Sequence, residues 1–240
     1  SGLQAMPQWN RSFNNPSGVR LGLISASLPL AAIPMFPLIS WICDTYGRRW
    51  AIILGSIGTI VGAIITCLSK NEGVFIAGRV VTGLFYYFPF VGCSCLINEL
   101  AHPRLRGMSA ALFMTSYHFG SAVAAWSTFT CLFWESSEWS WRLPALLQAF
   151  GPLVLVFTAL LEPESPRFLL SKFQGDKALD ILAKFHANGD YDDELVQREF
   201  QQISEHIQNG QMNKSGSWSS LIATPANRRR LLVVGVVTSG

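Results

Sequence analysis

Acidic and arginine residues gather in three short clusters, each placed where a long apolar stretch meets a polar one. The clusters are Asp44-Thr-Tyr-Gly-Arg-Arg49, Glu99 to Gly107, and Pro163-Glu-Ser-Pro-Arg-Phe-Leu169. Carboxylates and guanidinium groups form strong, often bidentate ion pairs, and prolines on both sides of Glu164 end a helix sharply. We therefore expect ion pairing between helix ends, with these candidate residues: Asp44, Arg48, Arg49, Glu99, Arg106, Glu164 and Arg167.

The stretches between the clusters have the length and composition of membrane spans. Half of the residues are hydrophobic and only 14% are charged, and the mean hydropathy is +0.30. A helix needs roughly 20 apolar residues to cross a bilayer, where its backbone groups must pair internally. We expect an all-α polytopic membrane helix bundle with five full spans and the start of a sixth, over Leu21–Cys43, Trp50–Ser69, Gly73–Asn98, Met108–Trp134, Leu143–Leu161 and Leu231–Gly240.

Prolines and glycines inside the spans predict how they bend and pack. Pro29, Pro34 and Pro37 each remove a backbone donor from the first span, so we expect it to be kinked. In the second span, Gly58 and Gly62 have the spacing that allows close contact between helices.

The distribution of positive charge predicts the orientation. Thirteen of the eighteen lysines and arginines fall in connections on the side of the three clusters. Because cytoplasmic loops of membrane proteins are rich in Lys and Arg, this side is predicted to be cytoplasmic. On the other side we expect a belt of interfacial tryptophans, namely Trp9, Trp134, Trp139 and Trp141.

The segment that follows the fifth span is more polar. Residues 162–230 are predicted to be cytoplasmic, with one amphipathic helix over Ala178–Phe185, a second over Leu195–Ile207, and a flexible linker over Gln208–Ser220. We therefore divide the chain into residues 1–161, part of a first transmembrane half; residues 162–230, cytoplasmic helices and linker; and residues 231–240, the start of a second half.

Several function classes are excluded by what the sequence lacks. A net charge of +3, without a basic run interleaved with aromatics, does not suit a nucleic-acid-binding protein. The chain has no His-Glu-x-x-His, no Gly-x-Ser-x-Gly and no phosphate-binding glycine loop, and its five cysteines have no metal-ligand spacing. We expect no enzymatic activity, no cofactor, no bound metal and no obligate protein partner.

The order and spacing of the motifs resemble the sugar porter branch of the major facilitator superfamily. Pro163 to Leu169 is similar to the signature after its sixth span, Asp44 to Arg49 to its loop between spans two and three, and Glu99 to Gly107 to its loop between spans four and five. Gly78-Arg79 with Gly83 resembles its fourth-span pattern. Other stretches resemble fungal lactose-permease-like and hexose-permease-like members, namely Asn98 to Arg104, Phe119 to Trp126 and Trp141 to Gln148.

This resemblance implies a fragment that covers spans two to seven of twelve, in a protein with two six-helix halves and a sugar site between them. It implies a transporter in the plasma membrane that works by alternating access, with the ion pairs forming a cytoplasmic gate. Glu199 joins this gate by the same resemblance, because the family carries an acid in that cytoplasmic helix. The implied partners are a sugar, protons and the lipid bilayer.

Arg79 is a charged residue inside a span, where an arginine needs a partner or a wet cavity. In proton-coupled sugar porters the matching arginine pairs with an acid on the first span, which this chain lacks. The alternative is that Arg79, close to the end of its span, reaches out to the membrane surface. Both interpretations stay open.

The sequence leaves the transported solute open. The position at which many family members carry a sugar-binding glutamine is Met114 here, and Tyr117 and His118 are the nearby polar alternatives. We expect proton-coupled uptake of a mono- or disaccharide. The alternatives are a sensor of the same fold that binds sugar without transport, and a porter for a polyol or another small solute.

Overall fold

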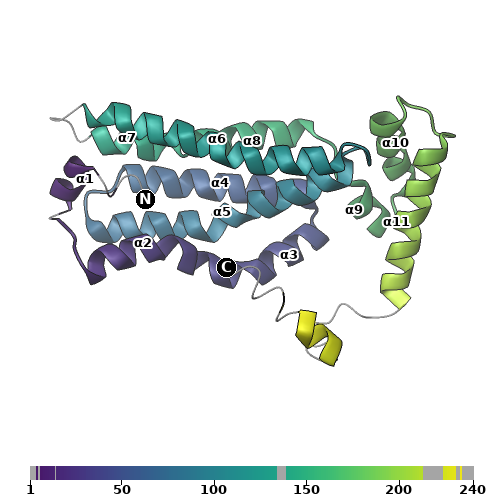
Figure 1. Ribbon diagram of the computed structural model, residues 1–240, viewed down its shortest axis with the longest axis horizontal. Helices are drawn as coiled ribbons and strands as arrows, with labels where there is room; N and C mark the ends of the chain where they lie inside the picture. The colour runs from purple at the N-terminus through teal and green to yellow at the C-terminus, as the bar shows by residue number, and fades with distance from the viewer. Residues whose placement is uncertain are drawn as a thin grey trace. The chain divides into compact units, whose positions relative to one another are not determined.

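The computed structural model describes residues 4, 6–13, 15–133, 139–212, 224–230 and 233, and within them the chain forms helices and no strand (Figure 1). The chain divides into two compact units, residues 1–168 and residues 169–240, which are described separately. The expected sixth span, residues 231–240, lies outside the described residues apart from Val233, and so do residues 213–220 of the expected linker and the three residues after it.

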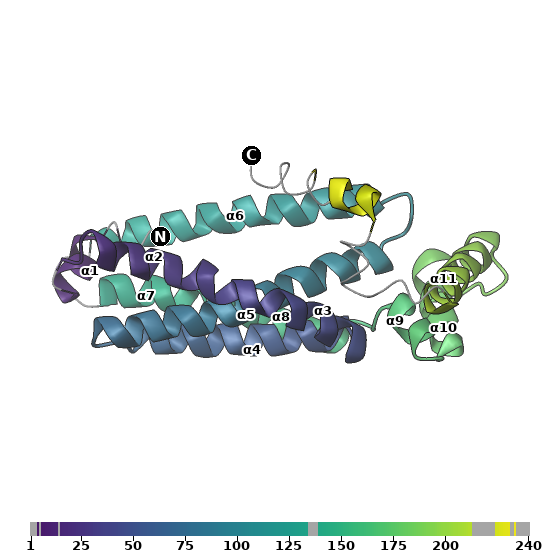
Figure 2. The ribbon, with the colours of Figure 1, turned by 90° about the horizontal axis from the view of Figure 1, so that it is seen from below.

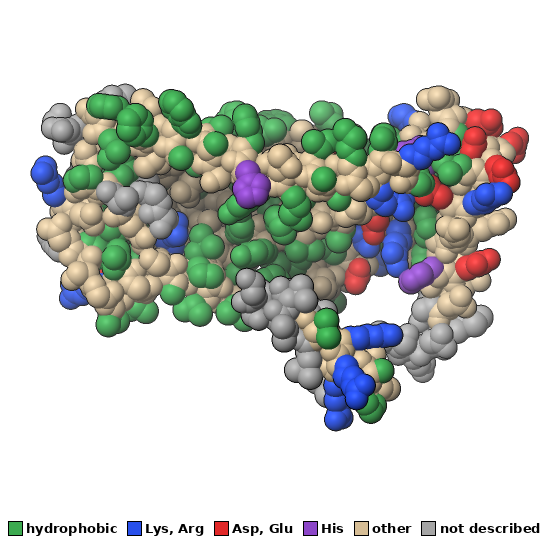
Figure 3. Space-filling model, viewed as in Figure 1, with side chains coloured by type: hydrophobic (Ala, Val, Ile, Leu, Met, Phe, Trp, Pro, Cys, Tyr) green, Lys and Arg blue, Asp and Glu red, His purple; other side chains and the backbone are tan. Residues whose placement is uncertain are grey.

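The helices of the first unit follow the expected spans. They are α1 (Pro7–Ser12), α2 (Val19–Ala32), the 3-10 turn η2 (Ile33–Met35), α3 (Phe36–Thr45), α4 (Arg48–Cys67), α5 (Glu72–Leu100), α6 (Arg106–Leu132), α7 (Trp139–Leu147) and α8 (Phe150–Leu161). The short helix α9 (Pro166–Ser171) crosses the boundary between the units. Hydrophobic side chains cover most of the surface of the long helices, and charged side chains gather near their ends (Figure 3).

Within the described residues, four helical stretches are long and apolar enough to cross a membrane, namely Val19–Thr45, Arg48–Cys67, Glu72–Leu100 and Trp139–Leu161. The expected span over Met108–Trp134 forms α6, which is long enough at 27 residues. It is not among the four, because serines, threonines and His118 lower its hydropathy. Figure 2 shows α6 along one edge of the first unit, where most of its side chains are exposed.

Prolines interrupt two of the spans. The predicted kink in the first span is confirmed, because α2 ends at Ala32 and the 3-10 turn that contains Pro34 leads into α3. The span over Trp139–Leu161 is broken at Gln148 and Ala149, which separate α7 from α8. Pro152 explains this break, since its ring has no N–H to donate to the carbonyl of Gln148 and would crowd it in a continuous helix.

Glycines bring α4 and α5 into close contact along their length. A Cβ added at Gly62 would lie 2.4 Å from Thr82 Oγ1 and 2.7 Å from the Thr82 backbone N. In the same seam, a Cβ at Gly78 would lie 2.8 Å from the Thr66 backbone N. The predicted role of Gly62 is therefore confirmed. Gly58 instead accommodates the ring of Phe85, which would lie 2.1 Å from an added Cβ.

The end of the first unit opposite the charged clusters is closed by aromatic packing. Trp9 on α1 and Trp141 on α7 are 0% and 1% exposed, and they pack with Phe13 and Phe75 at ring-centroid distances of 5.2 to 6.3 Å. The expected belt is therefore wrong for these two tryptophans, because they form a core and not an interface. Trp139 is exposed, and Trp134 lies outside the described residues.

The second unit is a helical hairpin of α10 (Gly175–His186) and α11 (Glu194–Met212). Its core contains Leu182, Ala183 and Val196, with Phe200 and Ile203 packed against them. Both amphipathic helices are confirmed. The expected linker begins too early, because α11 continues through Met212. Apart from Met212, its apolar residues end at Ile207, and extending an existing helix by a few residues costs less than starting a new one.

The seam between α4 and α5 leads to a stability prediction. Gly62→Ala places a methyl group against the Thr82 backbone, so the helices must separate, and we expect a loss of about 1–3 kcal/mol. Thermal unfolding of the purified full-length protein in detergent measures this as a lower Tm. Gly151→Ala on α8 is the control, because a Cβ there meets nothing within 4 Å. Equal Tm values for the two variants would contradict the close seam.

Candidate functional site

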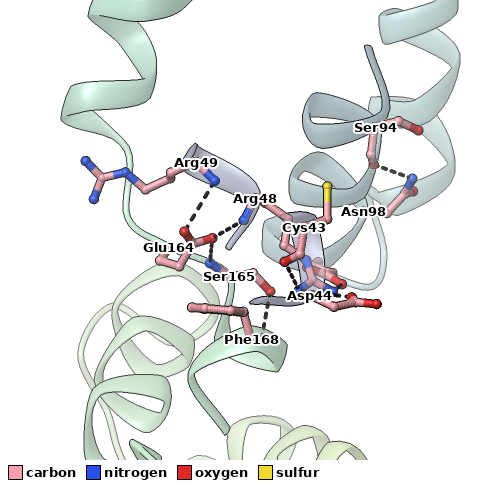
Figure 4. Close-up of polar contacts among 10 residues, drawn as sticks. Cys43, Asp44, Arg48, Arg49, Ser94, Asn98, Glu164, Ser165 and Phe168 are labelled. Carbon is pink, nitrogen blue, oxygen red and sulfur yellow. Dashed lines mark hydrogen bonds and ion pairs between the residues drawn. The ribbon is translucent and has the colours of Figure 1, made fainter. Parts of the chain in front are cut away.

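The carboxylate of Glu164 caps the N-terminus of α4 (Figure 4). The backbone N–H of Arg48 donates to Glu164 Oε1 at 3.0 Å, and that of Arg49 donates to Oε2 at 3.3 Å. The first N–H groups of a helix have no partner within it and carry a partial positive charge. The N-cap residue Gly47 has no side chain to satisfy them, so a carboxylate from the distant turn after α8 does so.

Arg49 makes the reciprocal contact. Its Nε donates to the carbonyl oxygen of Ala159 at 2.8 Å, and its Nη2 donates to that of Leu160 at 3.0 Å. These carbonyls belong to the last turn of α8, where they have no partner within the helix. Each helix end therefore receives its cap from the other: α4 from Glu164, and α8 from Arg49.

Gly47 is the residue that permits this contact. Its φ of +105° lies in a region that favours glycine. A Cβ at Gly47 would also lie 2.3 Å from Glu164 Oε2 and 3.2 Å from the ring of Phe168. Both the backbone conformation and the space therefore require glycine in Asp44-Thr-Tyr-Gly-Arg-Arg49.

The remaining residues of Pro163 to Leu169 shape the turn that carries Glu164. Glu162 is extended, as is usual for a residue before proline, and this ends α8. Ser165 Oγ accepts the N–H of Phe168 at 3.3 Å and so caps α9, in which Pro166 takes the first position. The signature thus holds two helix caps in sequence: one on α4 from Glu164, and one on α9 from Ser165.

Arg48 links three helices at the same end of the first unit. Its Nε lies 3.1 Å from Glu99 Oε2 on α5, its Nη2 donates to Glu99 Oε1 at 3.2 Å, and its Nη1 donates to the Cys43 carbonyl at 3.1 Å. The Arg48 and Glu99 side chains are 12% and 16% exposed. Asp44 lies 3.9 Å from Arg48 with its side chain 76% exposed, so this pair contributes little stability.

The other candidates for ion pairing lie on α6, α9 and α11. Arg106 begins α6, and Arg167 lies in α9, one residue after Pro166. Glu199 lies on α11 in the second unit, where its Oε2 is 2.5 Å from His186 Nδ1 on α10. The two side chains are 13% and 1% exposed. Sequence reasoning missed His186, although its place in the last turn of α10 suits a cation.

A second polar contact closes the loop of this hairpin. The hydroxyl of Tyr191 donates to Asp180 Oδ1 at 2.8 Å. This hydrogen bond, together with the nearby negative charge, raises the pKa of the Tyr191 phenol. Both side chains are exposed, so the contact positions the loop and adds little to its stability.

Arg79 lies in the third turn of α5 and is partly buried. Its Nε is buried without a hydrogen-bond partner among the described residues. A buried guanidinium donor without a partner is costly, so this position favours a nearby acceptor or water.

Met114, Tyr117 and His118 lie on α6 at a spacing that places them on one helix face, and all three are exposed in the first unit. The rings of Tyr117 and His118 contact each other at 5.6 Å. Among the described residues, no group of three His, Cys, Asp or Glu side chains is arranged to hold a metal ion.

The cap on α4 leads to a second stability prediction. Gly47→Ala strains the backbone and displaces the Glu164 carboxylate, so we expect a loss of about 1–3 kcal/mol, seen as a lower Tm of the full-length protein. Gly189→Ala is the matched control, because Gly189 has a similar φ of +96° but open space around its Cβ. A Gly47 variant as stable as the Gly189 variant would show that Glu164 does not fill this space.

Known proteins resemble this chain over most of its length. Residues 4–240 match the family model described as "Sugar (and other) transporter". The chain is 27% identical over 195 residues to a high-affinity glucose transporter of Kluyveromyces lactis, covering 81% of this chain and 35% of that protein. It is 31% identical over 191 residues to the MFS-type transporter criB of Aspergillus cristatus, covering 79% and 41%. It thus spans about two fifths or less of these relatives.

The fold also matches solved structures. The proton:xylose symporter XylE, bound to 6-bromo-6-deoxy-D-glucose, superposes with a TM-score of 0.76 at 19% identity, over 87% of this chain and 49% of that one. A partially occluded inward-open form of XylE from E. coli gives 0.75 at 20% identity, over 88% and 55%. With a family match from residue 4 to residue 240, the chain is an integral membrane protein that belongs to the sugar (and other) transporter family, and its fold is that of XylE, a protein of the major facilitator superfamily.

Proposed function

We propose that the full protein carries a sugar across a membrane by alternating access between two helical halves. The observation that supports this most is the family match over residues 4–240, together with relatives that are named as glucose transporters. Residues 1–161 are part of the first half, and residues 231–240 begin the second. The first unit then contributes one side of a site between the halves, so transport needs both halves.

The proposed orientation places the Arg48 end of the first unit, and residues 162–230, in the cytoplasm. The distribution of lysine and arginine supports this through the positive-inside rule. The membrane is proposed to be the plasma membrane. The candidate ion-pairing residues then lie at the cytoplasmic edge, where we propose that they form the gate: Asp44, Arg48, Arg49, Glu99, Arg106, Glu164, Arg167 and Glu199.

The face of α6 with Met114, Tyr117 and His118 is proposed to line the sugar path. In the first unit this face is exposed although it lies on a helix flanked by apolar spans, and it offers both aromatic and polar groups. A thioether at Met114 cannot form the hydrogen bonds that an amide would give to a hydroxyl group. Sugar selectivity therefore depends on Tyr117, His118 and groups from the other half. The substrate class we propose is a mono- or disaccharide.

An uptake panel tests the proposed function. The full-length protein is expressed in a cell without its own sugar transporters, and entry of radiolabelled hexoses, pentoses, disaccharides and polyols is measured. We expect saturable uptake of at least one sugar, competed by the same unlabelled sugar. Normal surface expression without uptake of any sugar would contradict transport, and sugar binding under those conditions would support a sensor instead.

Proton coupling is proposed to depend on Arg79. The buried Nε without a partner among the described residues supports an acid from the first span as its partner, and XylE, which shares the fold, is a proton symporter. An acid that pairs with Arg79 when ionised and releases it when protonated would link proton binding to the rearrangement of the helices.

Replacing Arg79 separates coupling from transport. We expect Arg79→Ala to abolish accumulation of sugar against its gradient, while exchange of sugar at equal concentrations continues. Uptake measured with and without a proton gradient gives this result. Arg79→Lys, which keeps the charge, is the control and should retain part of the accumulation. An Arg79→Ala variant that accumulates sugar like the natural protein would overturn the proposed role.

A further inference from the structure

We propose that Arg49 and Glu164 form a permanent joint that holds α4 and α8 together through the whole transport cycle, and not an ion pair that separates when the gate opens. This inference rests on the proposed function, because it divides the charged residues of the gate into a fixed set and a movable set.

Both residues bind backbone groups at the end of the other helix. Glu164 accepts two backbone N–H groups at the start of α4, and Arg49 donates to two backbone carbonyls at the end of α8. Neither side chain depends on the other's charge for its contacts. Separating the two helices would leave all four backbone groups without partners at once, together with both side-chain charges. An ion pair between side chains would release only the two charges.

An apolar cluster packs beside these hydrogen bonds. Ile53 on α4 and Ala159 on α8 are buried in one apolar cluster, with Ile52 and Leu96. On the other side, the missing side chain at Gly47 lets Glu164 approach the backbone of α4 directly. The joint therefore combines hydrogen bonds with a packed apolar contact, and the two must open together.

Asp44 differs from Arg49 and Glu164 in its exposure and in its contacts. Its side chain is 76% exposed and its contact with Arg48 is 3.9 Å long. This carboxylate can exchange partners without depriving any backbone group of a hydrogen bond. Asp44 is therefore well suited to form and break contacts during transport.

A covalent link across the joint tests its permanence. Trp50 on α4 and Leu160 on α8 are both exposed, and they line the same cavity of about 280 Å³, which Glu164 also lines. In the full-length protein, Trp50→Cys and Leu160→Cys are combined and joined by a short bifunctional thiol reagent, and mass spectrometry measures the extent of linkage. The single variants, treated in the same way, are the controls.

We expect the linked double variant to keep sugar uptake within about twofold of the same protein before linkage. Uptake that stops on linkage, while the treated single variants stay active, would overturn the joint, because it would show that α4 and α8 must move apart.

Thermal unfolding tests the contact between α4 and α8 even if the protein transports no sugar. Glu164→Gln and Arg49→Gln are each expected to lower the Tm of the full-length protein, and the double variant to lose clearly less than the sum, because their separate contacts hold the same pair of helix ends together. Glu162→Gln, an exposed carboxyl next to the turn, is the control and should leave the Tm unchanged. Additive losses, or no loss at all, would overturn the joint. If the variants lower the Tm as expected but the full-length protein takes up no sugar, only the proposed function is rejected.

Discussion

The need to cap the end of α4 organises the charged end of this protein. A helix that begins after a glycine has no side-chain cap of its own, so its first N–H groups need acceptors from another part of the chain. Glu164 supplies the acceptors from a turn that is more than one hundred residues away. To do so, α8 must end beside α4, and Arg49 then has the last carbonyls of α8 within reach. One interaction thus determines where two helices and the following turn lie.

Different kinds of interaction stabilise the two ends of the first unit. At one end, the side chains of Arg48, Arg49 and Glu164 form hydrogen bonds with backbone groups, so the contacts have direction and fixed length. At the other end, Trp9 and Trp141 belong to an aromatic core, which tolerates small shifts. Between them, the glycine seam sets the distance from α4 to α5. A helical half that moves as one body must be rigid. The hydrogen bonds at the charged end restrict the geometry of that half most strictly.

Much of this could be predicted from the residues. The kink at Pro34, the close approach at Gly62 and the two amphipathic helices follow from local chemistry that holds in any fold. The break at Gln148 was missed although Pro152 was a visible signal for it. The charged residues were found by type and position. Their partners were predicted as other side chains, whereas Glu164 and Arg49 bind backbone groups, which look alike at every position of a sequence.

The sequence by itself determined the apolar helices, the motifs and the family, because hydropathy and spacing are properties of neighbouring residues. It also determined which residues are charged at the helix ends. Only the tertiary structure decided that Glu164 caps α4, that Arg49 caps α8, that Glu199 meets His186, and that Trp9 is buried. Each of these depends on which distant segments lie side by side. The packing of whole helices decides which distant segments are neighbours, and no local sequence pattern shows it.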